Sequence, residues 1–153
     1  MARVVEKARN MFTLSGWAQT LPEKVAELAP NAFKLGHVTK SMVKSKQFFS
    51  TLEKLGYEGI VVTVDNHIGS RRRYAILNDF TAPPHLKYEV ILKHAEMKPN
   101  PGESFTSYYI RSNAGFELTW DTIRELRSIT SLKIILKGIL CKEDAATCLE
   151  FKK

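Results

Sequence analysis

The sequence predicts an α/β protein built on a parallel sheet. Strand and helix patterns alternate along the chain, and the strand patterns are nearly continuous in apolar residues, which is typical of strands covered on both faces. The clearest of them runs from Gly59 to Val64 and is rich in β-branched residues. Such a sheet is either open and doubly wound or closed as a (β/α)8 barrel. No dinucleotide-binding glycine motif or P-loop follows a strand, which argues against the common nucleotide-binding open folds.

The part of the chain before that strand contains two further strand and helix pairs. The predicted elements are, in order, a strand at Met11–Leu14, a helix from about Thr20 to Leu28, a strand at Phe33–Val38 and a helix from about Met42 to Leu55. Thr20 and Glu23 form a capping-box pattern with Pro22 in the first turn of the first helix, and Pro30 stops that helix. Gly56 is placed to end the second helix.

The last part of the chain repeats the same alternation. It predicts a helix from Thr119 to about Arg127, a strand at Lys133–Lys137 and a helix that begins at Lys142. Between the clear strand and this part, residues 66–118 have no strong period and include two proline-rich stretches, so we expect a long irregular connection. We treat residues 1–153 as a single domain that contains this loop.

Composition limits the function classes. The chain has 153 residues, 44% of them hydrophobic and 25% charged, which is typical of one soluble globular domain. It has no apolar run that could cross a membrane and no secretory signal pattern, so we expect an intracellular protein. The net charge of +7 and the Arg71–Arg73 run would suit nucleic acid or a small anion, but no nucleic-acid-binding motif accompanies them. The histidines and cysteines have no metal-ligand spacing.

Polar residues at strand ends are the candidate functional groups. Lys137 ends an apolar strand, directly before Gly138, and Thr63 stands near the end of the clear strand. In a barrel, catalytic residues project from the carboxyl ends of the strands. The alternatives are a solvated or ion-paired lysine, and hydroxyls of Ser15 and Thr63 that only satisfy nearby backbone groups.

Four segments of the chain, in order, resemble the FMN-dependent 2-hydroxy-acid oxidase family, which includes glycolate oxidase and the hydroxyacid oxidases. These segments are MFTLSGWA, GIVVTVDNHIGSRRR, NDFTAPPHL and TWDTIRELRSITSLKIILKGILCKEDA. The resemblance implies a (β/α)8 barrel, FMN as cofactor, oxidation of a small (S)-2-hydroxy acid to a 2-oxo acid, and a peroxisomal location. Because a whole barrel takes about 250 residues, the chain would hold about four of the strands, as a partial barrel.

The resemblance also implies roles for individual residues. Lys137 matches a lysine beside the N1/C2 carbonyl side of the flavin, where a fixed cation stabilises the reduced ring. Ser15 and Thr63 match hydroxyl residues that orient the isoalloxazine edge by hydrogen bonds. Arg72 matches an arginine that binds the substrate carboxylate with its planar fork. Arg71 and Arg73 are expected to be surface charges.

The chain departs from the family pattern at one strand. The family has Phe-Gln-Leu-Tyr where this chain has Phe33-Lys34-Leu35-Gly36-His37. Lys34 takes the position of the flavin-binding glutamine, and the position of the substrate-side tyrosine falls on Gly36 or, with a shift of one residue, on His37. The Ser-Asn-His-Gly segment with the family's catalytic histidine and the strands that bind the FMN phosphate are absent from the 153 residues.

Three functions from different classes follow from these observations. The first is an FMN-dependent 2-hydroxy-acid oxidase of which this chain is one portion. We expect it to be inactive alone because the catalytic histidine segment and the FMN-phosphate site are absent, and marginally stable because its outer strands have open edges. The second is a short non-catalytic relative that binds a full-length homologue or another protein partner, with assembly as a homo-oligomer as a further alternative. The third is a basic nucleic-acid-binding protein, which requires a steeply salt-dependent affinity.

Overall fold

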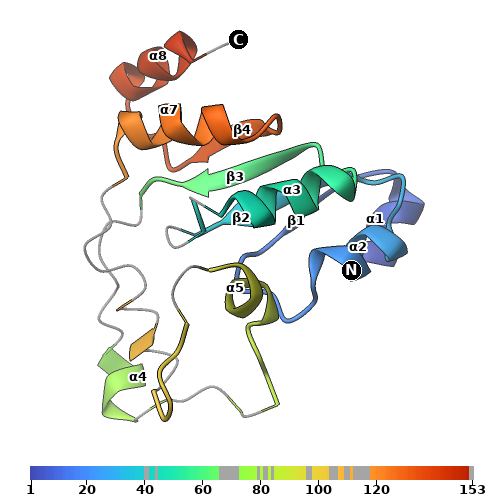
Figure 1. Cartoon of the computed structure of the whole chain (residues 1–153), viewed down its shortest axis with the longest axis vertical. Coiled ribbons are helices and arrows are strands. Elements are labelled where there is room, and N and C mark those ends of the chain that lie inside the picture. Colours follow the sequence, from blue (N-terminus) through green and yellow to red (C-terminus); the bar gives the residue numbers. More distant parts are fainter. Residues whose placement is uncertain are drawn as a thin grey trace.

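The structure is a computed structural model, and it describes residues 1–39, 42–43, 45–65, 73–78, 80, 83, 85–95, 98–103, 107–108, 111 and 118–151. Its centre is a parallel sheet of four strands within this part of the chain. The strands are β1 (Met11–Leu14), β2 (Phe33–Val38), β3 (Gly59–Thr63) and β4 (Lys133–Lys137). They lie side by side in chain order, so each strand pairs with the next one along the sequence (Figure 1).

Helices connect the strands, as in a barrel of β/α units. They are α1 (Ala2–Ala8), α2 (Pro22–Leu28), α3 (Lys46–Lys54), α4 (Arg73–Leu77), α5 (Glu89–His94), α7 (Trp120–Ile129) and α8 (Lys142–Glu150). In Figure 1, α3 lies over the middle strands and α7 lies beside β4, while α8 extends beyond α7 at the end of the molecule. No helix among the described residues is long and apolar enough to cross a membrane.

One face of the sheet packs against the helices. Leu14 pairs with Gly36, and Gly36 pairs with Ile60, so these residues share a face because paired residues of parallel strands point the same way. A Cβ atom on Gly36 would lie 2.5 Å from a methyl carbon of Leu52 on α3, which identifies this face as the one that α3 covers. The core residues here include Leu14, Val25, Val38, Phe48, Phe49, Leu52, Ile60, Val62, Ile123 and Leu126.

The opposite face of the sheet is only partly covered. Met11, Phe33 and Ile135 belong to it by the same alternation, and their exposed fractions are 55%, 40% and 41%. In a closed barrel this face is the packed interior, filled by side chains from all the strands. The exposure of these apolar side chains is therefore what a four-stranded portion of a barrel should show.

The predicted strands and the helices around them are confirmed, with differences at the helix ends. Thr119 caps α7 through a reciprocal box with Thr122, as expected, and Gly56 follows α3 with a φ of +69°. The capping box predicted at Thr20 is wrong, because α2 begins one residue later and its N-cap, Leu21, has no side-chain acceptor. Helix α1 was not predicted, and α4 and α5 interrupt the region expected to be irregular.

Candidate functional site

The candidate site lies where β3 and β4 end. Thr63 and Lys137 are the last residues of these strands and are paired in the parallel ladder, so their side chains leave the sheet side by side on the partly covered face. The strands stay joined past this point, because the Val64 N–H donates to the Lys137 carbonyl at 2.9 Å. The fold therefore brings together two of the predicted site residues that lie far apart in sequence.

Lys137 forms an ion pair with Asp65, which follows β3. The Lys137 Nζ lies 3.6 Å from an Asp65 carboxylate oxygen, and the two side chains are 54% and 43% exposed. This distance is longer than a hydrogen bond, and ion pairs this exposed contribute little to stability. The hydrogen-bond donors of the Lys137 side chain are thus available on the open side of the sheet.

His37 on β2 joins the same group of residues. It pairs with Val61, which shares the face of Thr63, and its Nε2 lies 2.8 Å from Thr63 Oγ1. The Gly16 N–H, from the turn after β1, donates to His37 Nδ1 at 3.4 Å. Burial and the nearby charge of Lys137 lower the pKa of His37 below its ordinary value, so the ring is neutral at pH 7.

Ser15 lies in the turn that follows β1. Its side chain is exposed, and its Oγ accepts a hydrogen bond from the Trp17 N–H at 3.1 Å. Such a contact is a common local role of serine, and it leaves the hydroxyl proton free to donate elsewhere. The next residue, Gly16, connects this turn to His37. Residues at or just after the carboxyl ends of the four strands therefore lie at one end of the sheet.

The structure does not bring Lys34 to this group. Lys34 is 2% exposed, and its Nζ donates to the carbonyl oxygens of Ala29, Pro30 and Ala32 at 3.1, 3.0 and 3.1 Å. The ammonium group thus satisfies carbonyls that follow the end of α2, on the face that α3 covers. These surroundings explain why a lysine can be buried here, because three backbone acceptors replace the water that its ammonium group loses.

The same alternation separates the two alternatives for the tyrosine position. Gly36 faces Leu52 of α3, whereas His37 faces Thr63. The structure therefore brings His37 to the candidate site. Arg72, the predicted substrate-binding residue, lies outside the described residues. Its neighbour Arg73 begins α4 and is exposed.

Asp65 is the member of the site that sequence reasoning did not assign, and His37 was only one of two alternatives for the tyrosine position. The signal for Asp65 is its place just after Thr63 at the end of a core strand. For His37, the signal is weaker, because a strand that is buried on both faces has no clear alternation to show which residues point inward. Within the described part of the chain, no group of three or more potential ligands could hold a metal ion.

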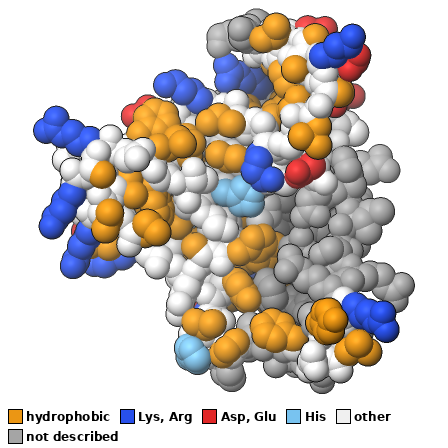
Figure 2. Space-filling model, turned by 180° about the vertical axis from the view of Figure 1, so that it is seen from behind, with side chains coloured by type: hydrophobic (Ala, Val, Ile, Leu, Met, Phe, Trp, Pro, Cys, Tyr) orange, Lys and Arg blue, Asp and Glu red, His pale blue; other side chains and the backbone are white. Residues whose placement is uncertain are grey.

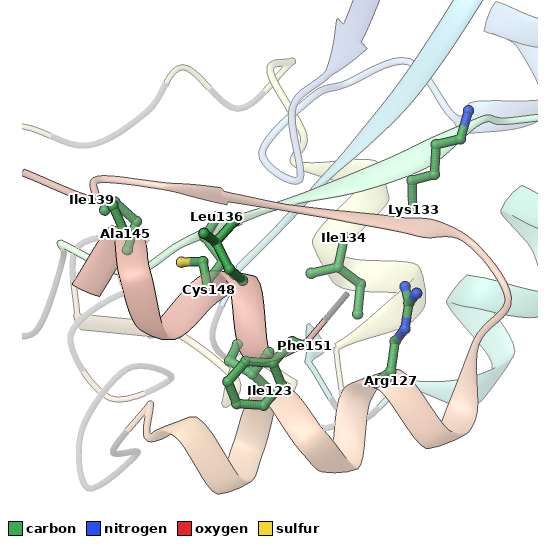
Figure 3. A pocket seen from close by; sticks show the side chains of 10 residues that line it. Ile123, Arg127, Lys133, Ile134, Leu136, Ile139, Ala145, Cys148 and Phe151 are labelled. Carbon is green, nitrogen blue, oxygen red and sulfur yellow. The ribbon is translucent and has the colours of Figure 1, made fainter. Parts of the chain in front are cut away.

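A hollow of the described structure lies away from the candidate site. It has a volume of about 660 Å³ and lies between α7, α8 and the helix-facing side of β4. Figure 3 shows Ile134 and Leu136 of β4 pointing into it, opposite Ile123 and Cys148. These strand residues alternate with Lys137, so the groove is on the other side of β4 from the candidate site. A smaller hollow of about 420 Å³ reaches Asp65 and Gly138.

The charge and hydrogen-bonding pattern of the strand ends limits what they could bind. Lys137 supplies a cation and Thr63 and Ser15 supply hydroxyl donors, beside exposed apolar surface. Figure 2 shows this mixture: on the side seen from behind, a histidine lies beside a cation and an acid near the centre, with hydrophobic patches around them. A flat ligand with several acceptor atoms along one edge would suit this set of groups.

Comparisons with known proteins agree with this arrangement. A family model described as FMN-dependent dehydrogenase matches residues 1–152. Glycolate oxidase 1 of Oryza sativa subsp. indica is 34% identical over 148 residues, which cover 94% of this chain and 40% of that protein. Glycolate oxidase of Spinacia oleracea is 33% identical over 154 residues, which cover 97% of this chain and 41% of that protein.

Solved structures show the same fold. A mandelate oxidase variant solved with (S)-mandelic acid superposes with a TM-score of 0.72 at 22% identity, over 97% of this chain and 38% of that chain. A second mandelate oxidase structure, with (S)-2-phenylpropionate, gives a TM-score of 0.70 at 23% identity. The chain thus spans about two fifths of the length of the proteins that it matches, and its four strands correspond to part of a barrel.

Proposed function

Because the chain belongs to the FMN-dependent dehydrogenase family, we propose that it forms one side of the flavin and substrate site of a 2-hydroxy-acid oxidase. The observation that carries this proposal is the convergence of Thr63 and Lys137 at the carboxyl ends of neighbouring parallel strands. Barrel enzymes have their active sites at this end. The reaction is the oxidation of an (S)-2-hydroxy acid to a 2-oxo acid, which fits relatives named for glycolate and mandelate.

The donor groups at the strand ends fit FMN. One edge of the isoalloxazine ring carries nitrogen and carbonyl oxygen atoms that accept hydrogen bonds, and Lys137, Thr63 and Ser15 can donate to them. When bound, FMN would take up the two electrons that leave the substrate alcohol. A lysine in this position supplies a fixed positive charge where negative charge increases during the reaction. Lys34 is not part of this site, because its ammonium group is bound to backbone carbonyls elsewhere.

The proposed substrate contact is Arg72. A guanidinium group binds a carboxylate through two parallel hydrogen bonds, which a lysine cannot do, and the residue follows the strand that ends at Thr63. We propose that Arg72 anchors the carboxylate of the 2-hydroxy acid and so fixes its orientation. The family analogy favours a peroxisomal location for this reaction.

We further propose that these 153 residues bind only one side of the cofactor and do not turn over substrate alone. The sheet described here has four strands, whereas a closed barrel has eight. No Ser-Asn-His-Gly segment occurs in the sequence, so a base for the substrate hydroxyl has to come from outside these residues. Production of hydrogen peroxide from glycolate or a longer 2-hydroxy acid by the pure chain would contradict this part of the proposal.

A titration with FMN, followed by the quenching of flavin fluorescence, tests the proposal. We expect saturable quenching by the unaltered chain and weaker binding by Lys137→Met. Lys142→Met is the matched control, because Lys142 is a solvent-exposed lysine on α8, 93% exposed at its side chain. An unaltered chain that does not bind FMN would overturn the proposal. Equal weakening by both substitutions would instead mean that the effect is one of general charge.

A second function, pairing with a full-length homologue, is favoured by a different observation. The sheet ends at β1 and β4, whose outer edges have no partner strand within the described residues, and apolar side chains are exposed on its partly covered face. Sedimentation of the chain with a purified homologous glycolate oxidase tests this function. A stable complex with defined stoichiometry would support it, and independent sedimentation of the two proteins would exclude it.

A further inference from the structure

His37 is held between two neighbours by both of its ring nitrogens. The Gly16 N–H approaches Nδ1 at 3.4 Å, and Thr63 Oγ1 lies 2.8 Å from Nε2. These partners come from the turn after β1 and from the end of β3, so the imidazole of β2 joins both of its neighbouring strands. Both ring nitrogens of His37 are therefore engaged by the protein, and neither is available to bind a ligand on the open face of the sheet.

The partner of Nδ1 decides where the ring proton is. A backbone amide can only donate, so Nδ1 accepts and carries no proton. In a neutral imidazole the proton is then on Nε2, and Nε2–H donates to Thr63 Oγ1. Burial, and among the described residues the charge of Lys137 on β4, lower the pKa of His37, which agrees with a neutral ring. Lys137 itself is paired with Asp65.

The direction of the Thr63 hydroxyl follows from this arrangement. Because Thr63 Oγ1 accepts a hydrogen bond from His37 Nε2–H, the hydroxyl proton of Thr63 cannot point toward His37. The side chain of Thr63 is next to that of Lys137, on the partly covered face of the sheet. The hydroxyl proton is therefore available to an acceptor in front of this face.

We propose that His37 is a positioning residue that holds the Thr63 hydroxyl as a donor toward the open face of the sheet. In the proposed function, on which this identification of the ligand rests, the acceptor is a ring nitrogen or carbonyl oxygen of the isoalloxazine. A tyrosine at this position could present its own hydroxyl to a substrate. His37 instead acts through Thr63, and the substrate receives no hydrogen bond from residue 37.

The tautomer can be measured on the unaltered chain without any ligand. We expect nitrogen NMR of the His37 ring at pH 7 to show a protonated Nε2 and an unprotonated Nδ1. A protonated Nδ1, or a positively charged ring, would overturn the inference. This measurement does not depend on FMN, so it decides the role of His37 even if the chain fails to bind the cofactor and the proposed function fails.

Affinity for FMN tests the consequence. His37→Phe removes both ring nitrogens and should weaken binding about fivefold, the effect of one ordinary hydrogen bond. His37→Gln should retain most of the affinity, because its amide can accept from Gly16 and donate to Thr63. His85→Gln, at an exposed histidine, is the control and should change nothing.

A double-substitution cycle separates positioning from general damage. Thr63→Val should weaken FMN binding, and adding His37→Phe to it should cause little further loss, because the group that His37 orients is already gone. Additive losses would contradict the inference. So would a His37→Gln variant that binds as poorly as His37→Phe while both unfold at the same urea concentration as the unaltered chain.

Discussion

Gly138 packs directly against Asp65, because a Cβ atom at position 138 would lie 2.6 Å from both Cβ and Cγ of Asp65. The φ angle of Gly138 is +113°, which residues with a side chain rarely adopt. Two independent restrictions therefore require glycine in the turn after β4. The close approach brings Asp65 beside Lys137 and so fixes the ion pair at the edge of the candidate site.

Substitution of Gly138 should be costly for this reason. We expect Gly138→Ala to lower the free energy of unfolding by about 1–3 kcal/mol, the cost of a strained backbone residue, and to weaken FMN binding as well. Urea unfolding measures the first effect. Gly56→Ala is the matched control, since Gly56 has a φ of +69° but a Cβ atom added there would have no neighbour within 4 Å. Equal losses for both would mean that the contact with Asp65 is unimportant.

Lys34 should matter for stability and not for cofactor binding. Lys34→Met would leave three carbonyls near the end of α2 without their donor, and we expect a loss of about 1–3 kcal/mol in the free energy of unfolding. Affinity for FMN should stay the same under conditions where the variant is folded. Lys54→Met, at an exposed lysine of α3, is the control for the loss of one charge. Weaker FMN binding by folded Lys34→Met would mean that Lys34 contributes to cofactor binding after all.

Stability should fall in mildly acidic solution. Burial lowers the pKa of His37, and Lys137 lowers it further. Burial also lowers the pKa of His94, where lowering by Lys93 and Lys98 outweighs the raising effect of Glu23. Below about pH 6.5 the two histidines bind protons in the unfolded chain but not in the folded chain, so the free energy of unfolding decreases as the pH is lowered. The decrease is at most about 1.4 kcal/mol per pH unit for each histidine.

Urea unfolding between about pH 7 and pH 5 measures this effect. The loss should be smaller in His37→Gln and in His94→Leu. The second substitution should cost little at pH 7, because neither ring nitrogen of His94 has a hydrogen-bond partner among the described residues. The lowered pKa of Glu23 acts only below its ordinary value of 4.5 and does not interfere. A profile that stays flat between these pH values would rule out neutral, buried histidines.

Self-association should depend on the partly covered face of the sheet. We expect the chain to associate as its concentration rises. Ile135→Ser removes apolar surface from this face and should reduce that association, which sedimentation velocity measures. Leu140→Ser is the control, because Leu140 is 92% exposed but lies outside the sheet. If both variants associate alike, the sheet face is not the contact surface.

The sheet could be predicted from the sequence because its strands are local and strongly apolar. The run Gly59 to Val64 has no reasonable alternative to a buried strand, and Thr119 has the right residue type at the start of α7. Once the strands were predicted, Thr63 and Lys137 could be assigned to their carboxyl ends, where a barrel has its active site. These are properties of short segments, and they do not depend on what packs against them.

The orientation of β2 could not be predicted in the same way. Lys34, Gly36 and His37 differ in side chain, but a strand covered on both faces has no alternation that assigns them to one side or the other. Only the contacts of Gly36 with Leu52 and of His37 with Thr63 separate the two faces. Helix α1 was missed because it has no buried residue and hence no apolar stripe to reveal it.

The pairing of each strand with its successor has a consequence for how this protein is made. As the chain leaves the ribosome, β2 finds β1 already present and β3 finds β2, so three strands can assemble without waiting for later residues. The connection from β3 to β4 is much longer, and closing a longer loop costs more chain entropy and slows folding. Synthesis should therefore pass through a stage in which Thr63 is in place and Lys137 is not, and the candidate site would be completed by the last strand to dock.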